Sequence, residues 1–345
     1  MFLRVIKSRA PLRISFAGGG TDVPPYPEMK GGAVISTTIT KYAYVSLRMR
    51  NDNEITINSI DYDLLLSIKS ISDLRYDGKL DLVKAAIKAF ETREYGFDML
   101  ISCDSPPGSG LGSSSAVMVA IIGALARLTG KSLTRYEIAD LAYRLERIDL
   151  GIKGGLQDQY ASAFGGFNFI EFHKSRVIVN PLRISPETLN ELHSNLLLFD
   201  TRKTRLSAGI LDRQIRSVVE KKKDVLESLD RIKEIAVEMK NCLLRGELAR
   251  FGELLYEAWE YKKRLDPQIS NPMIERLFSI AKREGAIGGK LCGAGGGGHL
   301  LIYCDLERRH RVIKALEKAG CRYVAFGFDS QGLQTWEVKE GKVRT

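Results

Sequence analysis

The spacing of apolar and polar residues changes along the chain and predicts a mixture of strands and helices. Short apolar runs at 43–47, 54–57 and 97–103 are bounded by turn residues, a pattern typical of β-strands. Apolar positions three and four residues apart at 80–95 predict a helix. The largely apolar stretch 113–128 contains several small residues, which indicates a second helix in close contact with its surroundings.

Two further helices begin with recognisable capping signals. Thr134 and Glu137 have the spacing of a capping box, and the helix that they open is expected to run to about Ile148. Asn271 followed by Pro272 places an N-cap residue before a proline at the first helical position. The aromatic and glycine-rich segment 164–172 is expected to form a strand with a turn.

The pattern changes near the proline-containing segment 181–186. One apolar strand is predicted at 196–199, and the chain is then helical and charged from about 206 to 264. We therefore expect two domains, residues 1–185 and 186–345. Strand, helix and strand are predicted near the end of the chain, at 299–304, 306–318 and 323–328.

The composition is that of a globular protein. The chain has 345 residues, of which 44% are hydrophobic and 27% charged, so a sizeable core is expected. No run of eighteen or more apolar residues occurs, and the first ten residues lack the apolar core of a signal peptide. The five cysteines are scattered and form no CxxC pair, which argues against a zinc site or a disulfide framework. We expect a reducing, cytoplasmic location and no membrane partner.

The formal net charge of +10 allows two interpretations, nucleic-acid binding or the handling of phosphorylated ligands. The basic residues are spread along predicted helices and alternate with acids, as in 213–240, which is typical of solvated helix faces. No nucleic-acid-binding motif accompanies the charge. We therefore expect a small-molecule partner and no nucleic acid.

A glycine- and serine-rich loop precedes the helix predicted at 113–128. Its glycines allow the backbone to approach a ligand closely, and the serines that follow begin the helix. A helix N-terminus presents unpaired N–H groups and the positive end of the dipole, which together suit a triphosphate. A serine hydroxyl at this place can also bind magnesium. The candidate nucleotide-binding residues are Pro107, Gly108, Ser109, Gly110, Leu111, Gly112, Ser113, Ser114 and Ser115.

This loop differs from the common nucleotide-binding motifs. It lacks the lysine of a Walker A motif and the position and downstream acid of a Rossmann fingerprint. The alternative is a Gly/Ser turn that only caps a buried helix. A second glycine cluster at 289–298 also indicates a tight turn or close ligand approach, with a flexible hairpin loop as its alternative. Apolar strand residues follow at once at 300–303, which weakens that alternative.

Three motifs occur in order and together resemble those of the GHMP kinases. They are the segment 9–22, the loop at 106–115, and the glycine-rich segment 290–298, and the resemblance spans about residues 9–330. Gly18-Gly19-Gly20-Thr21-Asp22 looks most like the matching motif of the heptose 7-phosphate kinases, whereas galactokinases carry Gly-Glu-His-Thr-Asp there. The segment 259–271, which includes Lys262 and Lys263, also resembles the heptose kinases.

The resemblance implies a fold and an activity. The expected fold class is α+β, with an N-terminal ribosomal-protein-S5-like α/β domain, a C-terminal ferredoxin-like domain and the active site in the cleft between them. The expected enzyme is a sugar kinase that uses ATP and Mg²⁺. Its expected reaction phosphorylates the anomeric hydroxyl of D-glycero-D-manno-heptose 7-phosphate to give the 1,7-bisphosphate.

The resemblance also assigns the catalytic residues. Glu146 and Ser114 would ligate magnesium, Asp158 would act as general base on the sugar hydroxyl, and Arg13 would lie near that hydroxyl. Without the resemblance, the favoured interpretation of Glu146 is a solvated helix acid that pairs with Arg144 or Arg147, and the alternative for Asp158 is an acid that stabilises a turn.

The substrate-binding residues come from three segments. Asp22 would bind sugar hydroxyls, although an Asx turn before two prolines is its alternative. Thr204 and Arg205 would clamp the distal phosphate. The preceding segment 200–203 departs from the heptose kinases, because basic residues stand where an uncharged pair is common. The candidate substrate-binding residues are Gly19, Gly20, Thr21, Asp22, Thr204, Arg205, Gly293, Ala294, Gly295 and Gly296.

Two other functions compete with a heptose kinase. One is another GHMP small-molecule kinase, of the galactokinase or mevalonate type, although Thr21 and Asp22 favour a polyol acceptor. The other is a ligand sensor on a kinase fold that has lost its activity, which the retained Glu146, Asp158 and Ser114 disfavour. The expected partner is a phosphosugar, and the sequence gives no oligomeric state.

Overall fold

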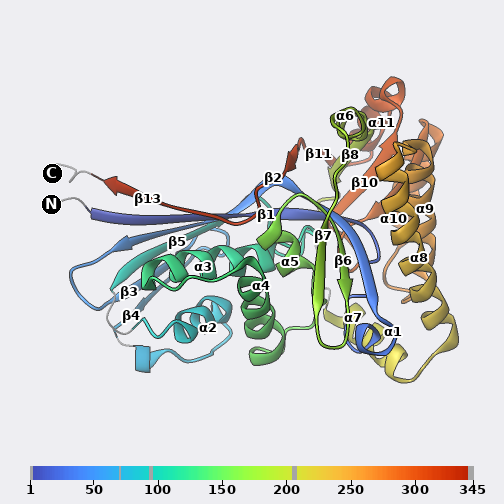
Figure 1. The fold of residues 1–345 in the computed structure, drawn as a ribbon. Helices are drawn as coiled ribbons and strands as arrows, with labels where there is room; N and C mark the ends of the chain where they lie inside the picture. The colour runs from blue at the N-terminus through green and yellow to red at the C-terminus, as the bar shows by residue number, and fades with distance from the viewer. Residues whose placement is uncertain (1–2, 70, 93–95, 204–207, 341–345) are drawn as a thin grey trace.

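A long sheet organises the first half of the molecule in the computed structural model, which describes residues 3–69, 71–92, 96–203 and 208–340 (Figure 1). Nine strands of these residues belong to it, in the order β13-β1-β2-β5-β3-β4, with β12 and β6 also paired to β2 and β7 to β6. All the pairs are antiparallel except the parallel pair of β3 with β5. The strands are β1 (Leu3–Ala17), β2 (Gly32–Met49), β3 (Ile55–Ser59), β4 (Leu64–Ile68), β5 (Phe97–Cys103), β6 (Phe167–Phe172), β7 (Val177–Pro181), β12 (Phe328–Asp329) and β13 (Gln334–Glu340).

Helices cover one face of this sheet (Figure 1). The most buried is α3, which packs on β1 and β2 and is apolar on nearly all sides. A Cβ atom at Gly123 of α3 would lie only 2.9 Å from the side chain of Leu333, just before β13. The small residues of this helix therefore permit the close approach that the sequence indicated. The helices of this half are α1 (Tyr26–Lys30), a 3₁₀ turn η1 (Ile71–Asp73), α2 (Asp81–Ala89), α3 (Ser113–Thr129), α4 (Arg135–Tyr143) and α5 (Gln157–Phe164).

Both predicted capping signals are confirmed. The Thr134 hydroxyl accepts a hydrogen bond from the Glu137 N–H at 3.2 Å, and the Glu137 carboxylate accepts one from the Thr134 N–H at 2.7 Å. The Asn271 side chain accepts from the Ile274 N–H at 3.1 Å and begins α10. After α4 the chain continues as a π-helical segment, η2 (Arg144–Asp149), so the predicted helix changes its hydrogen bonding before it ends.

A four-stranded antiparallel sheet in the order β11-β8-β10-β9 organises the second half. The strands predicted at 196–199 and 299–304 are confirmed. The single strand predicted at 323–328 is wrong, because β11 pairs with β8 whereas β12 pairs with β2 of the first sheet. The elements of this half are α6 (Pro186–Asn195), β8 (Leu196–Asp200), α7 (Ala208–Val219), α8 (Lys223–Arg245), α9 (Leu248–Lys263), α10 (Pro272–Arg283), β9 (Ala286–Leu291), β10 (His299–Cys304), α11 (Leu306–Lys318) and β11 (Arg322–Tyr323).

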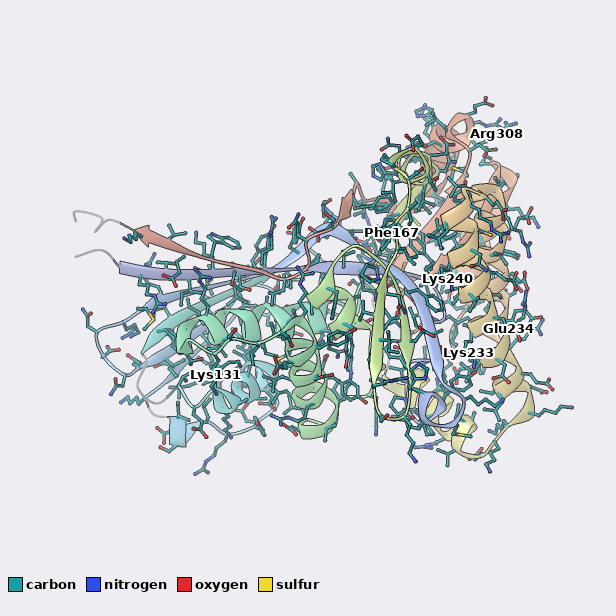
Figure 2. All side chains as sticks on the ribbon, viewed as in Figure 1. Lys131, Phe167, Lys233, Glu234, Lys240 and Arg308 are labelled. Atoms are coloured by element: carbon teal, nitrogen blue, oxygen red, sulfur yellow. The ribbon has the colours of Figure 1, made fainter. Side chains whose placement is uncertain are left out.

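The long helices α8 and α9 connect the two sheets. Phe251 of α9 packs edge-on against Phe16 of β1, with ring centroids 5.2 Å apart. From α8, Lys240 lies over the ring of Phe169 at 4.5 Å, and Lys233 donates to main-chain carbonyls at the end of α1 (Figure 2). The C-terminal end of β1 also contacts the second sheet directly, because Lys290 of β9 donates to the Ser15 and Phe16 carbonyls.

The end of the chain returns to the first sheet. β13 pairs with β1 over its whole length, from Gln334 opposite Arg9 to Glu340 opposite Leu3. The expected division at residue 185 stays a prediction. β12 and β13, from the end of the chain, complete the sheet that the first half begins. The expected α+β architecture is confirmed. Within the described residues, none of the helices has the length and apolar content needed to cross a membrane.

Candidate active site

One cleft brings together most of the residues that the motifs singled out. Its walls come from the end of β1, both glycine-rich segments, the chain from η2 to α5, and α9. The candidate residues that line it are Arg13, Gly19, Gly20, Asp22, Gly108, Gly110, Gly112, Ser113, Ser114, Ser115, Glu146, Asp158, Gly293, Ala294 and Gly295.

Several other candidates lie just outside this lining. Pro107 lies in an adjoining pocket, and Ser109 and Leu111 are buried within the loop. The Thr21 hydroxyl donates to the carbonyl of Gly18 at 2.7 Å and so stabilises the turn after β1. The Gly296 N–H donates to the Ile269 carbonyl at 2.8 Å behind the cleft. The proposed phosphate clamp, Thr204 and Arg205, lies outside the described residues.

The first glycine-rich loop has the backbone that an anion cradle requires. Gly108, Gly110 and Gly112 all have φ between 75° and 82°, a region that glycine adopts without steric cost. Gly112 is the N-cap of α3, and the first intrahelical bond runs from the Ala116 N–H to the Gly112 carbonyl. The N–H groups before Ala116 have no partner within the helix, so they are available to phosphate oxygens.

The two glycine-rich segments pack directly against each other. A Cβ at Gly110 would lie 2.5 Å from the carbonyl oxygen of Cys292, and one at Gly298 would lie 2.5 Å from that of Ser109. The backbone and the Nδ1 of His299 both contact the same Ser109 carbonyl, at 3.0 and 2.9 Å. The second segment therefore supports the first one from behind, through contacts that leave no room for side chains.

Arg13 and Asp158 form a pair at the base of the cleft. The Arg13 guanidinium donates to Asp158 Oδ1 from Nε at 2.7 Å, and its Nη1 donates to the Gly110 carbonyl at 2.6 Å. Asp158 is the second residue of α5, and its side chain is 18% exposed, whereas that of Arg13 is 6% exposed. The arginine therefore orients the carboxylate and attaches it to the glycine loop.

Glu146 accepts hydrogen bonds from two serines of the glycine- and serine-rich loop. It lies in the π-helical segment η2, a distortion that often occurs at functional sites. Its two carboxylate oxygens accept hydrogen bonds at 2.8 Å from the Ser114 and Ser115 hydroxyls, and Gln159 Nε2 donates to it at 2.6 Å. The interpretation of Glu146 as a solvated acid is wrong, because its side chain is only 1% exposed.

The donor set at this place suits magnesium. Ser114 and Glu146 offer hydroxyl and carboxylate oxygens, which are the ligands that Mg²⁺ prefers. Within the described residues, no cluster of three or more histidine, cysteine or acidic side chains surrounds a metal position. A site with few protein ligands is typical of Mg²⁺ that binds together with substrate phosphates.

Asp22 is buried at the other end of the cleft lining. It accepts hydrogen bonds from the Gly20 N–H at 2.9 Å, the Gln157 N–H at 3.2 Å and the Gln157 Nε2 at 3.1 Å. Burial is the main cause that raises the pKa of Asp22, against a lowering effect of the Gly20 hydrogen bond. A Cβ at Gly155 would lie 1.9 Å from its carboxylate, so the loop before α5 closes over it.

Several polar residues of the lining were not predicted as site residues. Ser15, Gln157, Lys262 and Lys290 are all less than 10% exposed and line the cleft. The Ser15 hydroxyl and the Gln157 Oε1 are buried without a hydrogen-bond partner in the described part of the chain. Buried polar atoms are usually paired, so these two are candidates for contacts with a ligand. Its place directly before Asp158 is the sequence signal that could have identified Gln157.

An apolar pocket adjoins the cleft at the beginning of α3. Ser113, Ser114 and Ile152 border both spaces, and the pocket extends between β5, α2 and α3. A mostly apolar pocket beside a phosphate cradle is suited to the flat base of a nucleotide. This pocket could not be predicted from the sequence, because its side chains come from separate segments. Its apolar lining includes Leu82, Val83, Ile101, Val117 and Leu150.

Comparison with known proteins identifies the same regions. Residues 81–166 match the family model for the GHMP kinases N terminal domain, and residues 239–321 match that for the GHMP kinases C terminal. The D-glycero-alpha-D-manno-heptose 7-phosphate kinase of Campylobacter jejuni is 38% identical over 341 residues, which are 97% of this chain and 100% of that protein. A mevalonate kinase of Pyrococcus horikoshii is 29% identical over a match that spans 89% of this chain and 92% of that protein.

Solved structures show the same architecture. The crystal structure of a D-glycero-D-manno-heptose 1-phosphate kinase from Bacteriodes thetaiotaomicron superposes with a TM-score of 0.82 and is 34% identical, covering 97% of this chain and 100% of the other. A galactokinase from Lactococcus lactis has a TM-score of 0.75 at 20% identity, covering 97% of this chain and 95% of the other, and shares the fold.

Proposed function

This chain belongs to the GHMP kinases and is an ATP-dependent sugar kinase; within that activity, we propose that its acceptor is D-glycero-D-manno-heptose 7-phosphate and that it phosphorylates the anomeric hydroxyl. The observation that supports the phosphoryl transfer itself is the convergence of Asp158, the Ser114–Glu146 pair and the N-terminus of α3 in one cleft. These are the base, the metal ligands and the phosphate cradle that a direct phosphoryl transfer needs.

ATP would lie with its triphosphate at the glycine loop and its base in the apolar pocket beside α3. The unpaired N–H groups before Ala116 and the helix dipole would bind the phosphate oxygens. Ser113 and Ser114 border both spaces, so one nucleotide can occupy the pocket and the cradle together. This arrangement directs the γ-phosphate toward Arg13 and Asp158.

Magnesium would be held by Ser114 and Glu146. The bound ion supplies charge neutralisation on the transferring phosphate. The chain supplies the orientation of its own ligands: Ser115 and Gln159 hold Glu146 in place through hydrogen bonds of 2.8 and 2.6 Å. A buried carboxylate with this support keeps its position when the nucleotide leaves.

The acceptor sugar would lie between Asp22 and Asp158. The unpartnered Ser15 hydroxyl and Gln157 Oε1, together with Asp22, are groups that can exchange hydrogen bonds with sugar hydroxyls. Asp158 would accept the proton of the reacting hydroxyl, and Arg13 would keep the carboxylate aimed at it. Because the transfer has a loose transition state, the position of this base matters more than its strength.

The choice of a phosphorylated heptose rests on the Campylobacter jejuni relative and on charge. Among the described residues that line the cleft, five side chains are basic and three are acidic. An excess of positive charge suits an acceptor that carries a phosphate of its own. The basic residues are Arg13, Arg147, Lys153, Lys262 and Lys290, and the acidic ones are Asp22, Glu146 and Asp158.

A panel of acceptors tests the substrate. The full chain, ATP and Mg²⁺ would be incubated with heptose 7-phosphate, unphosphorylated heptose, galactose and mevalonate, and the products identified by ³¹P NMR. We expect the heptose phosphate to show the highest kcat/KM and a new anomeric phosphate signal. Turnover of mevalonate or galactose in preference to every phosphosugar would overturn the choice of acceptor.

A further inference from the structure

Lys262 lies on the buried side of α9, where an amphipathic helix normally has an apolar residue. Leu255, Ala258 and Trp259 form the buried stripe of α9, and Lys262 continues it at the expected spacing. Lys262 is only 9% exposed, yet its side chain lines the cleft. Burying an ammonium group is costly unless it is paired, so its presence requires a compensating partner.

The partners within the chain do not saturate this ammonium. Lys262 Nζ donates to the carbonyl of Gly293, and no other hydrogen bond from it is made within the described residues. An ammonium has three donors, so two remain free. By contrast, Lys290 Nζ donates to two carbonyls, of Ser15 and Phe16, at 2.7 and 2.9 Å. Among the described residues, Lys262 therefore keeps two donors for a ligand, whereas Lys290 keeps one.

The next residue provides a comparison on the same helix. Lys263 lies outside the cleft lining and forms ion pairs with Glu260 at 2.7 Å and Glu275 at 3.3 Å. These carboxylates raise the pKa of Lys263. Lys262 has no such carboxylate in direct contact within the described chain, so its charge is left for a ligand to neutralise.

Lys262 shares the cleft lining with the catalytic pair, Arg13 and Asp158. Burial, and after it the charge of Arg13, lower the pKa of Lys262 to about 8, while Asp22 and Asp158 act in the opposite direction. These groups are the ones between which the acceptor sugar would lie. Lys262 and Arg13 are also attached to facing backbones, Lys262 to the Gly293 carbonyl and Arg13 to the Gly110 carbonyl.

We propose that Lys262 is a further catalytic residue, whose ammonium donates a hydrogen bond to the reacting oxygen of the acceptor. The acceptor O–H proton passes to Asp158, the oxygen forms a bond to the γ-phosphorus, and the bond from that phosphorus to the bridging oxygen breaks, with its electron pair leaving on ADP. Lys262 stabilises the negative charge on the attacking oxygen during this step. The proposal rests on the sugar-kinase activity and not on the identity of the sugar.

A purely structural role makes different predictions. If Lys262 only attached the second glycine segment to α9, its loss would disturb the support of the phosphate loop, because Gly293 packs against Gly110. ATP binding and stability would then fall together. A group that acts on the reacting oxygen affects kcat and leaves the binding of ATP intact.

Steady-state kinetics of the full chain separate these roles, with ATP, Mg²⁺ and the best acceptor of the panel. The variants are Lys262→Met, which keeps the length without the charge, Lys262→Arg, which restores a donor, and Lys263→Met as the matched control. We expect Lys262→Met to lower kcat by about 100-fold, the typical effect of removing one such donor, with the KM for ATP within about twofold. Lys262→Arg should recover part of kcat, and Lys263→Met should resemble the wild type.

Two results would overturn the proposal. One is a Lys262→Met enzyme that retains kcat within about threefold of the wild type, since a donor at the reacting oxygen cannot be so dispensable. The other is a loss of ATP affinity that accounts for the whole loss of activity. Lys262→Leu, which also removes both the charge and the donor, replaces Lys262→Met if the latter does not fold. A wild type that prefers an unexpected sugar would refute the acceptor choice alone, because each comparison here uses the acceptor that is turned over.

Discussion

Arg13 and Asp158 are 145 residues apart in the chain, yet the Arg13 Nη2 and the Asp158 Oδ1 lie 2.6 Å from each other in the folded protein. Arg13 comes from β1 and Asp158 from the first turn of α5. The same guanidinium also donates to the Gly110 carbonyl of the phosphate loop at 2.6 Å. One arginine thus connects the proposed base to the glycine loop, and under the proposed function this contact network would align the acceptor with the donor phosphate.

Asp158→Asn is expected to abolish transfer without abolishing nucleotide binding. The amide keeps the shape and can still contact Arg13, but it cannot accept the proton of the sugar hydroxyl. Loss of a general base costs roughly 10²–10⁴-fold in kcat. Acceptor kinetics and a separate titration with a fluorescent ATP analogue would measure the two effects. Asp149→Asn, at the exposed end of η2, is the control, and an active Asp158→Asn enzyme would show that another group is the base.

Ser114→Ala and Ser115→Ala form a matched pair for the metal site. Both hydroxyls donate to Glu146 at 2.8 Å, but only Ser114 borders the nucleotide pocket as well as the cleft. We expect Ser114→Ala to raise the Mg²⁺ concentration for half-maximal activity about tenfold, and Ser115→Ala to change it less, since loss of a group that holds a metal typically costs at least that much. Activity measured against Mg²⁺ concentration checks this. Equal effects of the two variants would mean that both serines act only through Glu146.

Gly110→Ala should weaken both the fold and nucleotide binding. The position has φ of 82°, and the added Cβ would lie 2.5 Å from the Cys292 carbonyl oxygen. Gly130→Ala is the control, because its φ of 69° imposes similar backbone strain while nothing lies within 4 Å of its Cβ. We expect the control to lose about 1–2 kcal/mol of unfolding free energy, and Gly110→Ala to lose more. Thermal unfolding with and without ATP would show whether the contact between the two glycine segments is essential.

Gln157→Leu tests the contact to the sugar. Leucine has a similar volume but lacks the Nε2 that donates to Asp22 at 3.1 Å and the buried Oε1 without a partner. Loss of one such hydrogen-bonding group is expected to raise the KM for the sugar about tenfold, since an unpaired polar partner costs 1–3 kcal/mol. The KM for ATP serves as the internal control and should not change. An unchanged KM for the sugar would place the acceptor elsewhere in the cleft.

The buried Lys262 also predicts a pH-dependent stability. Its pKa of about 8 in the folded state lies below the usual 10.5, so between these values the unfolded chain binds more protons and stability rises with pH. Below about pH 8 the charged lysine lowers the unfolding free energy by about 3 kcal/mol, because each pKa unit corresponds to about 1.4 kcal/mol. Lys262→Met should therefore unfold at a higher temperature than the wild type at pH 7.

The same comparison at higher pH provides the check. The difference in unfolding temperature between Lys262→Met and the wild type should shrink as the pH rises from 8 to 10.5, because the wild-type lysine becomes neutral in both states. A constant difference across this range would contradict the cost of the buried charge. If Lys262→Met is more stable but has a low kcat, the wild-type lysine lowers stability in favour of activity, which is a trade-off typical of active sites.

The sequence by itself determined the local features of this protein. The capping box at Thr134 and Glu137, the N-cap at Asn271 and the apolar helix at 113–129 all depend on residues within a few positions of one another. Local hydrogen bonds and helical periodicity express such short-range information directly. The ordered motifs also led to the family and to the named acids, because each motif is a contiguous segment whose chemistry is readable in place.

The tertiary structure decided which of these segments meet. The contact of Arg13 with Asp158, the packing of Gly110 against Cys292, the return of β13 to β1 and the projection of Lys262 into the cleft join residues from distant segments. No spacing pattern encodes such pairs, since they arise when the apolar faces of α3, α8 and α9 are buried and bring the attached loops together. The phosphate loop and the acids Asp22 and Asp158 could therefore be predicted from their own segments. The further polar groups that we propose for contact with the acceptor, Ser15, Gln157 and Lys262, became visible only after the two sheets had packed around a common core.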